Sequence, residues 1–267
     1  MPILGSSLAS FAVLGASGVT NVPVSTIGGN LGAAPSAAVG GGYIFASGSL
    51  QANTALAQKA QIELDKAILD VNAKGPGTNI TGGNLDAWQG SHGGFIIPGT
   101  YTVPAASTNL TGALILDGGG SNSAVWAFLF PTTLITSTTS TVSVVNVGDG
   151  ANVGLYWSVG TGATLNGNSF AGNVLATTIS SSDGGLTMTC GRLLSSETQV
   201  TLKQDTISIG CGKAGDVGFG SGGFDQGAFV GSGGEGGSNG QVVPEPGSLA
   251  LLGLGLAALG WGRGRQS

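Results

Sequence analysis

Trp126-Ala127-Phe128-Leu129-Phe130 is a short apolar run whose pattern returns three times further along the chain. The matching segments are Leu155-Tyr156-Trp157-Ser158-Val159, Gly172-Asn173-Val174-Leu175-Ala176 and Gly191-Arg192-Leu193-Leu194-Ser195. Their first residues are 29, 17 and 19 positions apart. Recurrence about every twenty residues is typical of a β-solenoid, in which each coil contributes three short strands and insertions lie at the corners. The repeat therefore predicts a mainly β protein built from stacked coils.

The composition agrees with many short strands. Of 267 residues 52 are glycine and only 8% are charged. The apolar runs are short and rich in Val, Ile and Leu, which favours strands joined by tight turns. A β-sandwich is the alternative fold, since it also contains short strands. The solenoid is favoured because the strands of a sandwich need not resemble one another.

One segment has the spacing of an α-helix. Over residues 51–74 apolar side chains recur three and four positions apart, which places them on one face of a helix. These side chains are Leu56, Ala60, Leu64, Ala67, Ile68 and Val71. Asn53 or Thr54 is the expected N-cap, and Gly75-Pro76 is the expected stop. The sequence predicts one long helix over about 51–74 in an otherwise β-rich chain.

The charge balance argues against nucleic acid as a partner. Eight Lys and Arg against thirteen Asp and Glu give a net charge of -5, whereas binding to phosphates needs a basic face. The first cationic side chain is Lys59, so the weakly apolar start lacks the basic region of a secretory signal. The length suffices for one domain with a substantial core plus a tail.

The residue pattern predicts no catalysis, no metal and no cofactor. β-Helices that cleave polysaccharides need clustered carboxylates, but the aspartates here are scattered, mostly beside Gly or Asn, and are typical of turns. They are Asp86, Asp117, Asp149, Asp183 and Asp205. His92 has no Gly-x-Ser-x-Gly elbow to accompany it, and two cysteines with one histidine are too few ligands for a zinc site.

The last 26 residues have three parts that together resemble the PEP-CTERM sorting signal of Gram-negative bacteria. Val243-Pro244-Glu245-Pro246 precedes an apolar segment over 248–261, and Arg263 and Arg265 follow it. As a helix this segment would be roughly 21 Å long, against a bilayer core of roughly 30 Å. We therefore expect a transient contact with the inner membrane, with both arginines on the cytoplasmic side.

This resemblance implies export, a processing protease that acts at the Pro-Glu-Pro motif, and secretion or a place at the cell surface or in the extracellular matrix. The glycine-dense residues 212–241 have the composition of a flexible linker. The expected organisation is a solenoid domain over 1–211, a linker over 212–241 and a sorting signal over 242–267. The missing basic N-terminal region conflicts with export, and we give more weight to the C-terminal signal because it is more specific.

Cys190 and Cys211 are 21 positions apart, which is close to one coil. Residues one coil apart lie on neighbouring coils, near the Cα separation of roughly 4.4–6.8 Å that a disulfide requires. An exported protein also meets oxidising conditions. A disulfide that holds the last coil is the favoured prediction, and two buried free thiols are the alternative.

Several motifs before the tail resemble the DUF3494 family of ice-binding proteins. They are Leu8-Ala9-Ser10-Phe11-Ala12-Val13-Leu14-Gly15-Ala16, Val19-Thr20-Asn21, Thr26-Ile27-Gly28-Gly29-Asn30-Leu31-Gly32, Pro98-Gly99-Thr100-Tyr101, Leu110-Thr111-Gly112-Ala113-Leu114-Ile115-Leu116-Asp117 and Phe170 to Leu175. The resemblance implies a discontinuous right-handed β-helix of triangular cross-section, with one long helix packed alongside and both terminal regions in one solenoid. It also implies that the protein adsorbs to the surface of ice crystals through a flat face rich in Thr, Ser, Asn and Gly.

The same resemblance implies candidate ice-binding residues. Some family members carry Thr, then Ala or Gly, then any residue, then Thr or Asn. Here the pattern matches Thr81 to Asn84 and Thr161 to Thr164. The other expected face residues are Thr26, Asn30, Thr138, Thr141, Thr177 and Thr178. Threonine suits such a face because its hydroxyl forms hydrogen bonds, its methyl group organises nearby water, and its β-branch restricts χ1.

A structural role is the second hypothesis. A Thr-rich solenoid with a Gly-rich linker and a sorting signal also suits a cell-surface or extracellular-matrix adhesion protein that uses the same fold without touching ice. Ice activity of the domain and surface retention of the full chain discriminate between the two hypotheses.

Overall fold

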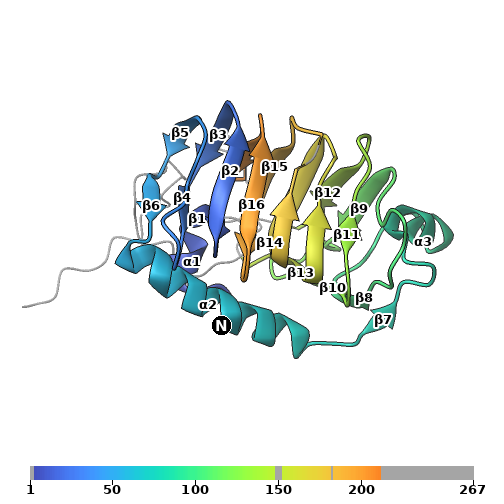
Figure 1. Cartoon of the computed structure of the whole chain (residues 1–267). Helices are drawn as coiled ribbons and strands as arrows, with labels where there is room; N and C mark the ends of the chain where they lie inside the picture. Colours follow the sequence, from blue (N-terminus) through green and yellow to red (C-terminus); the bar gives the residue numbers. More distant parts are fainter. Residues whose placement is uncertain (1–2, 148–151, 182, 212–267) are drawn as a thin grey trace, which may run out of the picture. The chain divides into compact units, whose positions relative to one another are not determined.

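The computed structural model describes residues 3–147, 152–181 and 183–211, and the predicted linker and sorting signal over 212–267 lie outside the described residues. Short strands dominate the described part, and the strand pairings within it are parallel (Figure 1). Parallel pairing excludes a sandwich of antiparallel strands. The prediction of a mainly β protein with stacked coils is confirmed.

The elements in chain order are α1 (Ser6–Ala9), β1 (Phe11–Gly15), β2 (Gly18–Val22), β3 (Ser25–Gly28), β4 (Asn30–Ala33), β5 (Tyr43–Ser47), β6 (Leu50–Ala52), α2 (Ala55–Asn72), β7 (Thr78–Asn79), α3 (Leu85–Ser91), β8 (Gly99–Thr102), β9 (Ala113–Asp117), β10 (Val125–Phe130), β11 (Leu134–Ile135), β12 (Thr141–Val145), β13 (Gly154–Thr164), β14 (Ser169–Ser180), β15 (Thr187–Ser195), β16 (Gln199–Lys203) and β17 (Thr206–Ser208). No helix among the described residues has the length and apolar character needed to cross a membrane.

The strands form three parallel ladders. The helix ladder, so named because α2 covers it, has the order β6-β4-β1-β15-β14-β13-β10-β8-β7. The threonine ladder has the order β5-β3-β17-β15-β14-β12-β9. The third ladder has the order β2-β16-β14-β13-β11. The long strands bend from one ladder into the next, so β13 and β15 contribute to two ladders and β14 to all three.

The recurring apolar segments of the sequence lie side by side in the helix ladder. Trp126 pairs with Leu155, Tyr156 with Asn173, and Asn173 with Arg192, which is the alignment that the sequence repeat predicts. The third position of each segment is buried in the core, at Phe128, Trp157, Val174 and Leu193. A slip of one residue would turn these side chains outward, so the core holds the register.

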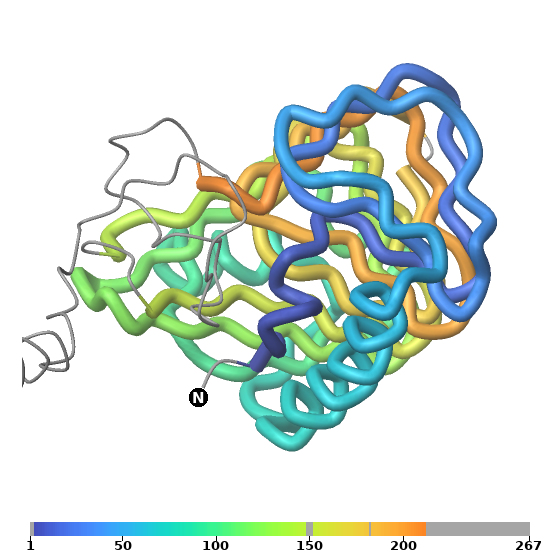
Figure 2. Tube along the Cα trace, turned by 90° about the vertical axis from the view of Figure 1, so that its left-hand side faces the viewer, coloured from blue at the N-terminus to red at the C-terminus, as the bar shows by residue number. Residues whose placement is uncertain are grey.

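The chain does not pass through the stack in sequence order (Figure 1). Strands β1 to β6 build one end of the stack, α2 then runs along its side to the other end, and the later strands return coil by coil. At the junction β15 pairs with β1, β16 with β2 and β17 with β3. Figure 2 shows the blue N-terminal coil beside the orange last coil. The solenoid is therefore discontinuous, as the family resemblance implies.

α2 is shorter than the helix predicted over about 51–74. It begins after Thr54, whose side-chain oxygen accepts a hydrogen bond from the backbone N–H of Ala57 at 3.3 Å, as predicted for an N-cap. Gln51 and Ala52 belong to β6 and pair with β4 instead. The helix begins later than predicted because these residues extend the helix ladder.

One face of α2 packs on the outer side of the helix ladder. Its buried residues are Ala57, Ala60, Leu64, Ala67 and Val71. They form an apolar cluster with outward side chains of the ladder, among them Ala127, Tyr156, Leu175 and Leu194. The spacing of three and four that predicts the helix therefore marks its buried face. Because α2 covers this ladder, the other two ladders supply the exposed walls of the solenoid.

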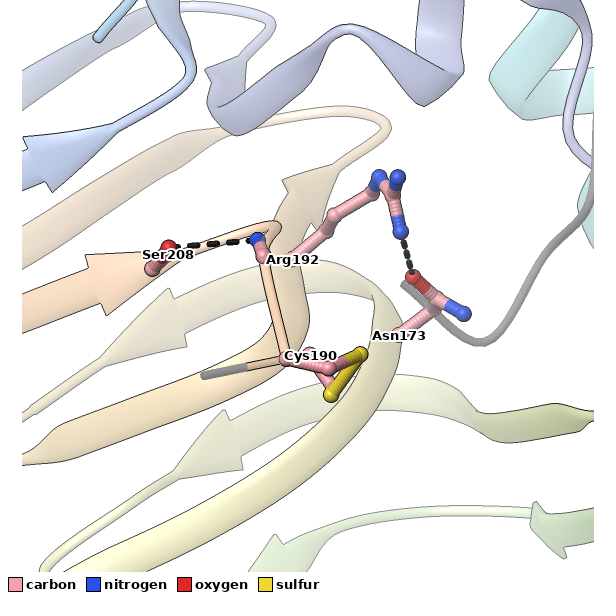
Figure 3. Close-up of a disulfide and its surroundings, with 6 residues drawn as sticks. Asn173, Cys190, Arg192 and Ser208 are labelled. Atoms are coloured by element: carbon pink, nitrogen blue, oxygen red, sulfur yellow. Dashed lines mark hydrogen bonds between the residues drawn. A yellow bond between two sulfur atoms is a disulfide. The ribbon is translucent and has the colours of Figure 1, made fainter. Parts of the chain in front are cut away.

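Arg192 joins the two sides of the junction from the outer face of the helix ladder (Figure 3). Its buried guanidinium donates from Nε and Nη2 to the carbonyl oxygen of Ala9, at 3.0 and 2.8 Å, and from Nη1 to Oδ1 of Asn173 at 2.8 Å. Ala9 belongs to the start of the chain, 183 positions away. One side chain thus joins β14 and β15 to the segment that enters β1.

The disulfide between Cys190 and Cys211 is present, with the two Cα atoms 4.3 Å apart, so the predicted pairing is confirmed (Figure 3). Cys190 is buried in the core, and Cys211 follows β17. The bond joins two positions separated by 21 residues, for which the chain-entropy model gives a stabilisation of about 3 kcal/mol. It ties the last coil to the coil before it.

We predict that Arg192→Met lowers the free energy of unfolding by about 2–6 kcal/mol, because the carbonyl of Ala9 and the amide oxygen of Asn173 would lose buried donors at a cost of about 1–3 kcal/mol each. Urea unfolding followed by circular dichroism measures the change. The matched control is Lys66→Met, which removes an exposed cation of α2 and should cost less than about 1 kcal/mol. Equal losses in the two variants would contradict the role of Arg192 at the junction.

Candidate functional site

The threonine ladder carries an aligned row of hydroxyl groups, called the hydroxyl row below. Its register partners, strand by strand, are Thr26, Thr206, Thr187, Ser169 and Thr141. The row crosses five neighbouring strands without a gap, and it passes through the junction between β3 and β17. At its two ends the same position holds Ile44 of β5 and Ala113 of β9.

The core fixes the direction of the hydroxyl row. The residue that follows each member is buried: Ile27, Ile207, Met188, Phe170 and Val142. Successive side chains of a strand point to opposite faces, so the row members point outward. Thr187 and Thr206 are exposed, and the other three are half-buried. A slip of one residue in any of these strands would bury a hydroxyl and expose an apolar side chain.

The hydroxyls of the row have no hydrogen-bond partner among residues 3–147, 152–181 and 183–211. The neighbouring Ser25 differs, because its buried Oγ donates to Oδ1 of Asn21 at 2.8 Å and accepts from the backbone N–H of Asp205 at 2.9 Å. A hydroxyl that is not used inside the protein can bind water or a ligand. The row is therefore chemically available as well as exposed.

The row is also regular and stiff. Neighbouring strands lie about 4.7–4.9 Å apart, so its side chains repeat at that interval, and the β-branch of threonine restricts χ1. The next outward positions on the same wall include the small residues Gly28, Ser208 and Ser143. The wall thus presents hydroxyl and methyl groups at fixed spacing, with small side chains beside them.

The wall around the row is nearly free of charge. Within the parts of its seven strands that belong to the threonine ladder, Asp117 is the only acidic or basic residue, and it lies at the end of β9. Its carboxylate accepts hydrogen bonds from the backbone N–H of Gly119 at 2.8 Å and from Nδ2 of Asn146 at 3.0 Å, as expected for a turn residue. Burial raises the pKa of Tyr43 on β5 to about 12.

Asp205 is a buried carboxyl at the corner before β17, and its function is structural. It accepts hydrogen bonds from Oγ of Ser181 and from the backbone N–H groups of Lys203 at 2.9 Å and Leu186 at 3.0 Å. Burial raises its pKa and outweighs these hydrogen bonds, which lower it. The carboxyl links the last two corners of the stack and does not face the wall.

The third ladder carries a similar row with different chemistry. Its aligned residues are Thr20, Thr201, Ser180, Thr164 and Ile135. Oγ1 of Thr20 donates to Oγ1 of Thr201 at 3.1 Å, and Oγ1 of Thr178 donates to the carbonyl oxygen of Gln199 at 3.3 Å. Lys203 adds a charge to the same strand as Thr201. This wall is less regular, and part of its hydroxyl groups are already bonded.

The residues predicted as ice-binding candidates do not form one surface. Thr26 and Thr141 lie in the hydroxyl row, and Thr164 and Thr178 lie on the third ladder. Thr161 and Thr177 lie at the corner between the helix ladder and the third ladder. Thr138 is in the turn before β12. The structure therefore brings only two of the candidates into the row.

The remaining candidates lie off the exposed walls. Asn30 is only 7% exposed, and it donates to Oγ of Ser10 and accepts from the backbone N–H of Ser49, both at 3.0 Å. A buried side chain cannot contribute to an exposed face, so the prediction for Asn30 is wrong. Asn84 caps α3 by accepting from the backbone N–H of Ala87 at 2.8 Å, and Thr81 precedes it in an exposed turn. The Thr81 to Asn84 match thus forms a helix start outside the three ladders.

Three members of the row, Ser169, Thr187 and Thr206, are not among the candidates predicted from the sequence. A local signal exists for Thr187 and Thr206. Thr26-Ile27-Gly28, Thr141-Val142-Ser143, Thr187-Met188-Thr189 and Thr206-Ile207-Ser208 share threonine, then a large apolar residue, then a small residue. This tripeptide marks a strand with an outward threonine and an inward core residue.

No three His, Cys, Asp or Glu side chains within the described ranges lie close enough to hold a metal ion. His92 is the C-cap residue of α3, where its ring stacks on Trp88 with centroids 3.8 Å apart. The most regular feature of the molecule is thus an extended wall that suits binding to a repetitive surface.

A solenoid with such a wall defines a class of protein that binds surfaces, and the comparisons identify the family. Residues 13–208 match the family model described as ice-binding-like, and these residues include strands of all three ladders. The chain belongs to the ice-binding-like family. Residues 242–265 match the PEP-CTERM protein-sorting motif, which implies export to the cell surface or the extracellular space.

The relatives support the same family and fold. An ice-binding protein of Nostoc sp. strain HG1 is 32% identical over 266 residues, which cover 96% of this chain and 84% of that protein. The crystal structure of an ice-binding protein from an Antarctic biological consortium has a TM-score of 0.65 at 29% identity and covers 78% of this chain and 91% of that chain. The structure of one from the ascomycete Antarctomyces psychrotrophicus has a TM-score of 0.62 at 26% identity and covers 76% and 96%.

We predict that the hydroxyls of the row contribute little to folding. The double variant Thr187→Val and Thr206→Val should change the free energy of unfolding by less than about 0.5 kcal/mol, because these groups are not bonded within the described structure. The control Ser25→Ala should cost about 1–3 kcal/mol, because it leaves buried partners without a bond. Urea unfolding of the three proteins makes the comparison. A loss of similar size in the double variant would show that the row is structural.

Proposed function

We propose that this protein is an extracellular ice-binding protein that adsorbs to ice through the threonine ladder and inhibits ice growth or recrystallisation. The hydroxyl row carries this proposal, because it is the longest aligned set of unbonded hydroxyls on the exposed walls. Membership of the ice-binding-like family supports it. The residues proposed to contact ice are Thr26, Thr141, Ser169, Thr187 and Thr206.

The physical reason is a match between two rigid, repeating surfaces. Ice presents water molecules at fixed positions, and the row presents hydroxyl and methyl groups at the fixed spacing of the ladder. Side chains already held by the core lose little entropy when the surface binds. The lack of charge helps as well, since an ammonium or carboxylate group would hold its hydration water in a different arrangement.

The third ladder is the less suitable wall. Its Thr20 and Thr201 hydroxyls bond to each other, which uses up part of their capacity for water. Lys203 would also have to give up hydration in order to approach ice. We therefore assign contact with ice to the threonine ladder, and we assign Thr164, Thr178, Thr161 and Thr177 no direct role in it.

The finer architecture and the route of export also belong to this proposal. Three ladders per coil support a triangular cross-section, and the family resemblance supports right-handed winding. We propose a solenoid domain over 1–211, a linker over 212–241 and a sorting signal over 242–267. In a Gram-negative bacterium the signal would contact the inner membrane transiently and be processed by a protease at Pro-Glu-Pro. The match to the sorting motif supports this route.

We propose a role without catalysis, metal or cofactor. The alternative function is that of a cell-surface or extracellular-matrix structural or adhesion protein, and the sorting motif is the observation that favours it. The two functions are compatible, because a protein held at the surface can act on ice in the surrounding water.

The decisive prediction concerns the wall. Recombinant residues 1–241 should show thermal hysteresis and suppress ice recrystallisation, and Thr187→Tyr should reduce both several-fold because a ring in the middle of the row prevents close approach. Thr201→Tyr on the third ladder and Thr161→Tyr at the corner are the controls and should retain activity. An inactive wild-type domain would reject ice binding. Loss of activity only in the Thr201→Tyr variant would move the site to the third ladder.

A further prediction tests the sorting signal. Deletion of residues 242–267 should release the protein from the cell surface or matrix into the medium, because the chain would lose the motif that directs processing. Fractionation of cells, matrix and medium, followed by immunoblotting, measures the distribution. Internal deletion of residues 222–231 within the linker is the control and should leave retention intact. Unchanged retention of the truncated chain would contradict this route.

A further inference from the structure

The two edge strands of the threonine ladder, β9 and β5, differ in how their outer backbone groups are hydrogen-bonded. At the β9 end, α3 packs against β9, and the Gln89 side chain takes the place of a further strand. Its Nε2 donates to the carbonyl oxygen of Ala113 at 3.1 Å, and its Oε1 accepts from the backbone N–H of Ile115 at 2.6 Å. Asp86 adds an acceptor for the backbone N–H of Thr111 at 2.9 Å. The free edge of β9 is therefore capped by polar side chains.

The β5 end has no comparable cap among the described residues. β5 pairs with β3 along one edge, and no strand or side chain in the described ranges bonds to the other edge at Ile44, Phe45 or Ala46. The backbone N–H and C=O groups along that edge are complementary to another extended strand. An edge of this kind is a template for strand addition.

The side chains around this edge lack the usual protection. Proteins commonly guard an open edge with charged residues, especially lysine, or with proline. Here the chain contains no Asp, Glu, Lys or Arg before Lys59, so the coil that contains β5 and β6 is uncharged. Ile44 is 58% exposed, Leu50 49% and Phe45 37%. The end coil thus combines free backbone groups with exposed apolar side chains and no repulsive charge.

We propose that two copies of this chain associate through this end, with β5 of one copy pairing antiparallel with β5 of the other. A second copy is the occupant that the edge favours, because it brings the same unpaired strand and the same uncharged apolar surface. Self-complementary contacts about a two-fold axis are the commonest way in which identical chains associate. Gln89 and α3 prevent the same pairing at the opposite end, so association stops at two copies.

The proposed pairing has a consequence for the walls. The two-fold axis of an antiparallel pair of identical strands is perpendicular to the sheet, so the outer faces of both copies point to the same side. The threonine ladders of two copies would then form one continuous sheet, with both hydroxyl rows on one surface. The association itself does not depend on ice binding.

Sedimentation equilibrium of the full chain over a dilution series tests the proposal. The wild type should reach twice the chain mass of 25.9 kDa and dissociate on dilution. Ile44→Lys and Ala46→Lys should each remain at the mass of one chain, because they place like charges across the β5 pair. Circular dichroism checks that the variants are folded, and the second substitution covers failure of the first to fold.

The matched control is Ile115→Lys, which charges an exposed apolar position of the same wall at the capped end and should still form the two-chain species. A wild type that stays at the mass of one chain at every concentration would overturn the proposal. Coverage of β5 by residues outside the described ranges would give this same result. Association that persists in both lysine variants of β5 would also overturn it, because it would point to another surface such as the apolar C-terminal segment. Neither result bears on the ice assay, so the two proposals fail separately.

Discussion

The backbone pairing between the first and last coils is the constraint on which the rest of the solenoid depends. β1, β2 and β3 lie beside β15, β16 and β17, and each of the three ladders crosses this junction. Without it the chain would form two short stacks with open edges and an exposed core. The pairing joins segments that are nearly the full length of the domain apart in sequence. Forming it therefore costs the conformational entropy of closing a loop of almost the entire domain. Buried polar groups gather there, with Arg192 bonded to Ala9 and the backbone N–H of Asp205 bonded to Ser25.

The junction also determines how regularly the hydroxyls of the candidate surface are aligned. The hydroxyl row runs from Thr141 to Thr26 only because β17 and β3 meet in register, with Thr206 opposite Thr26. Cooperative packing of Ile27 and Ile207 in the core holds that register. Stability and surface regularity therefore have the same physical origin, since the side chains that fill the core fix the direction of the hydroxyls between them.

The three walls of the solenoid have different roles. The helix ladder is covered by α2, whose small residues, such as Ala57, Ala60 and Ala67, allow close packing against the strands. The third ladder uses part of its hydroxyls for its own bonds. The threonine ladder is left exposed, unbonded and uncharged over its central strands. The same division separates the ends of the stack, where Gln89 closes one edge and the coil of β5 leaves the other open.

Local sequence determined the features that depend on near neighbours. The apolar repeats predicted the register of β10, β13, β14 and β15, the spacing of three and four predicted α2 with Thr54 as its cap, and the distance of one coil predicted the Cys190–Cys211 bond. Tertiary structure decided the functional wall. Thr26, Thr164 and Thr178 look alike in sequence, yet the first lies in an unbonded row and the others lie on a different wall. The wall on which each threonine lies depends on the strand that pairs with its own strand. That partner strand is roughly one coil away in sequence or, across the junction, at the other end of the domain. Alternation along a strand distinguishes inside from outside, but only the stacking of distant strands decides which outward residues form one surface.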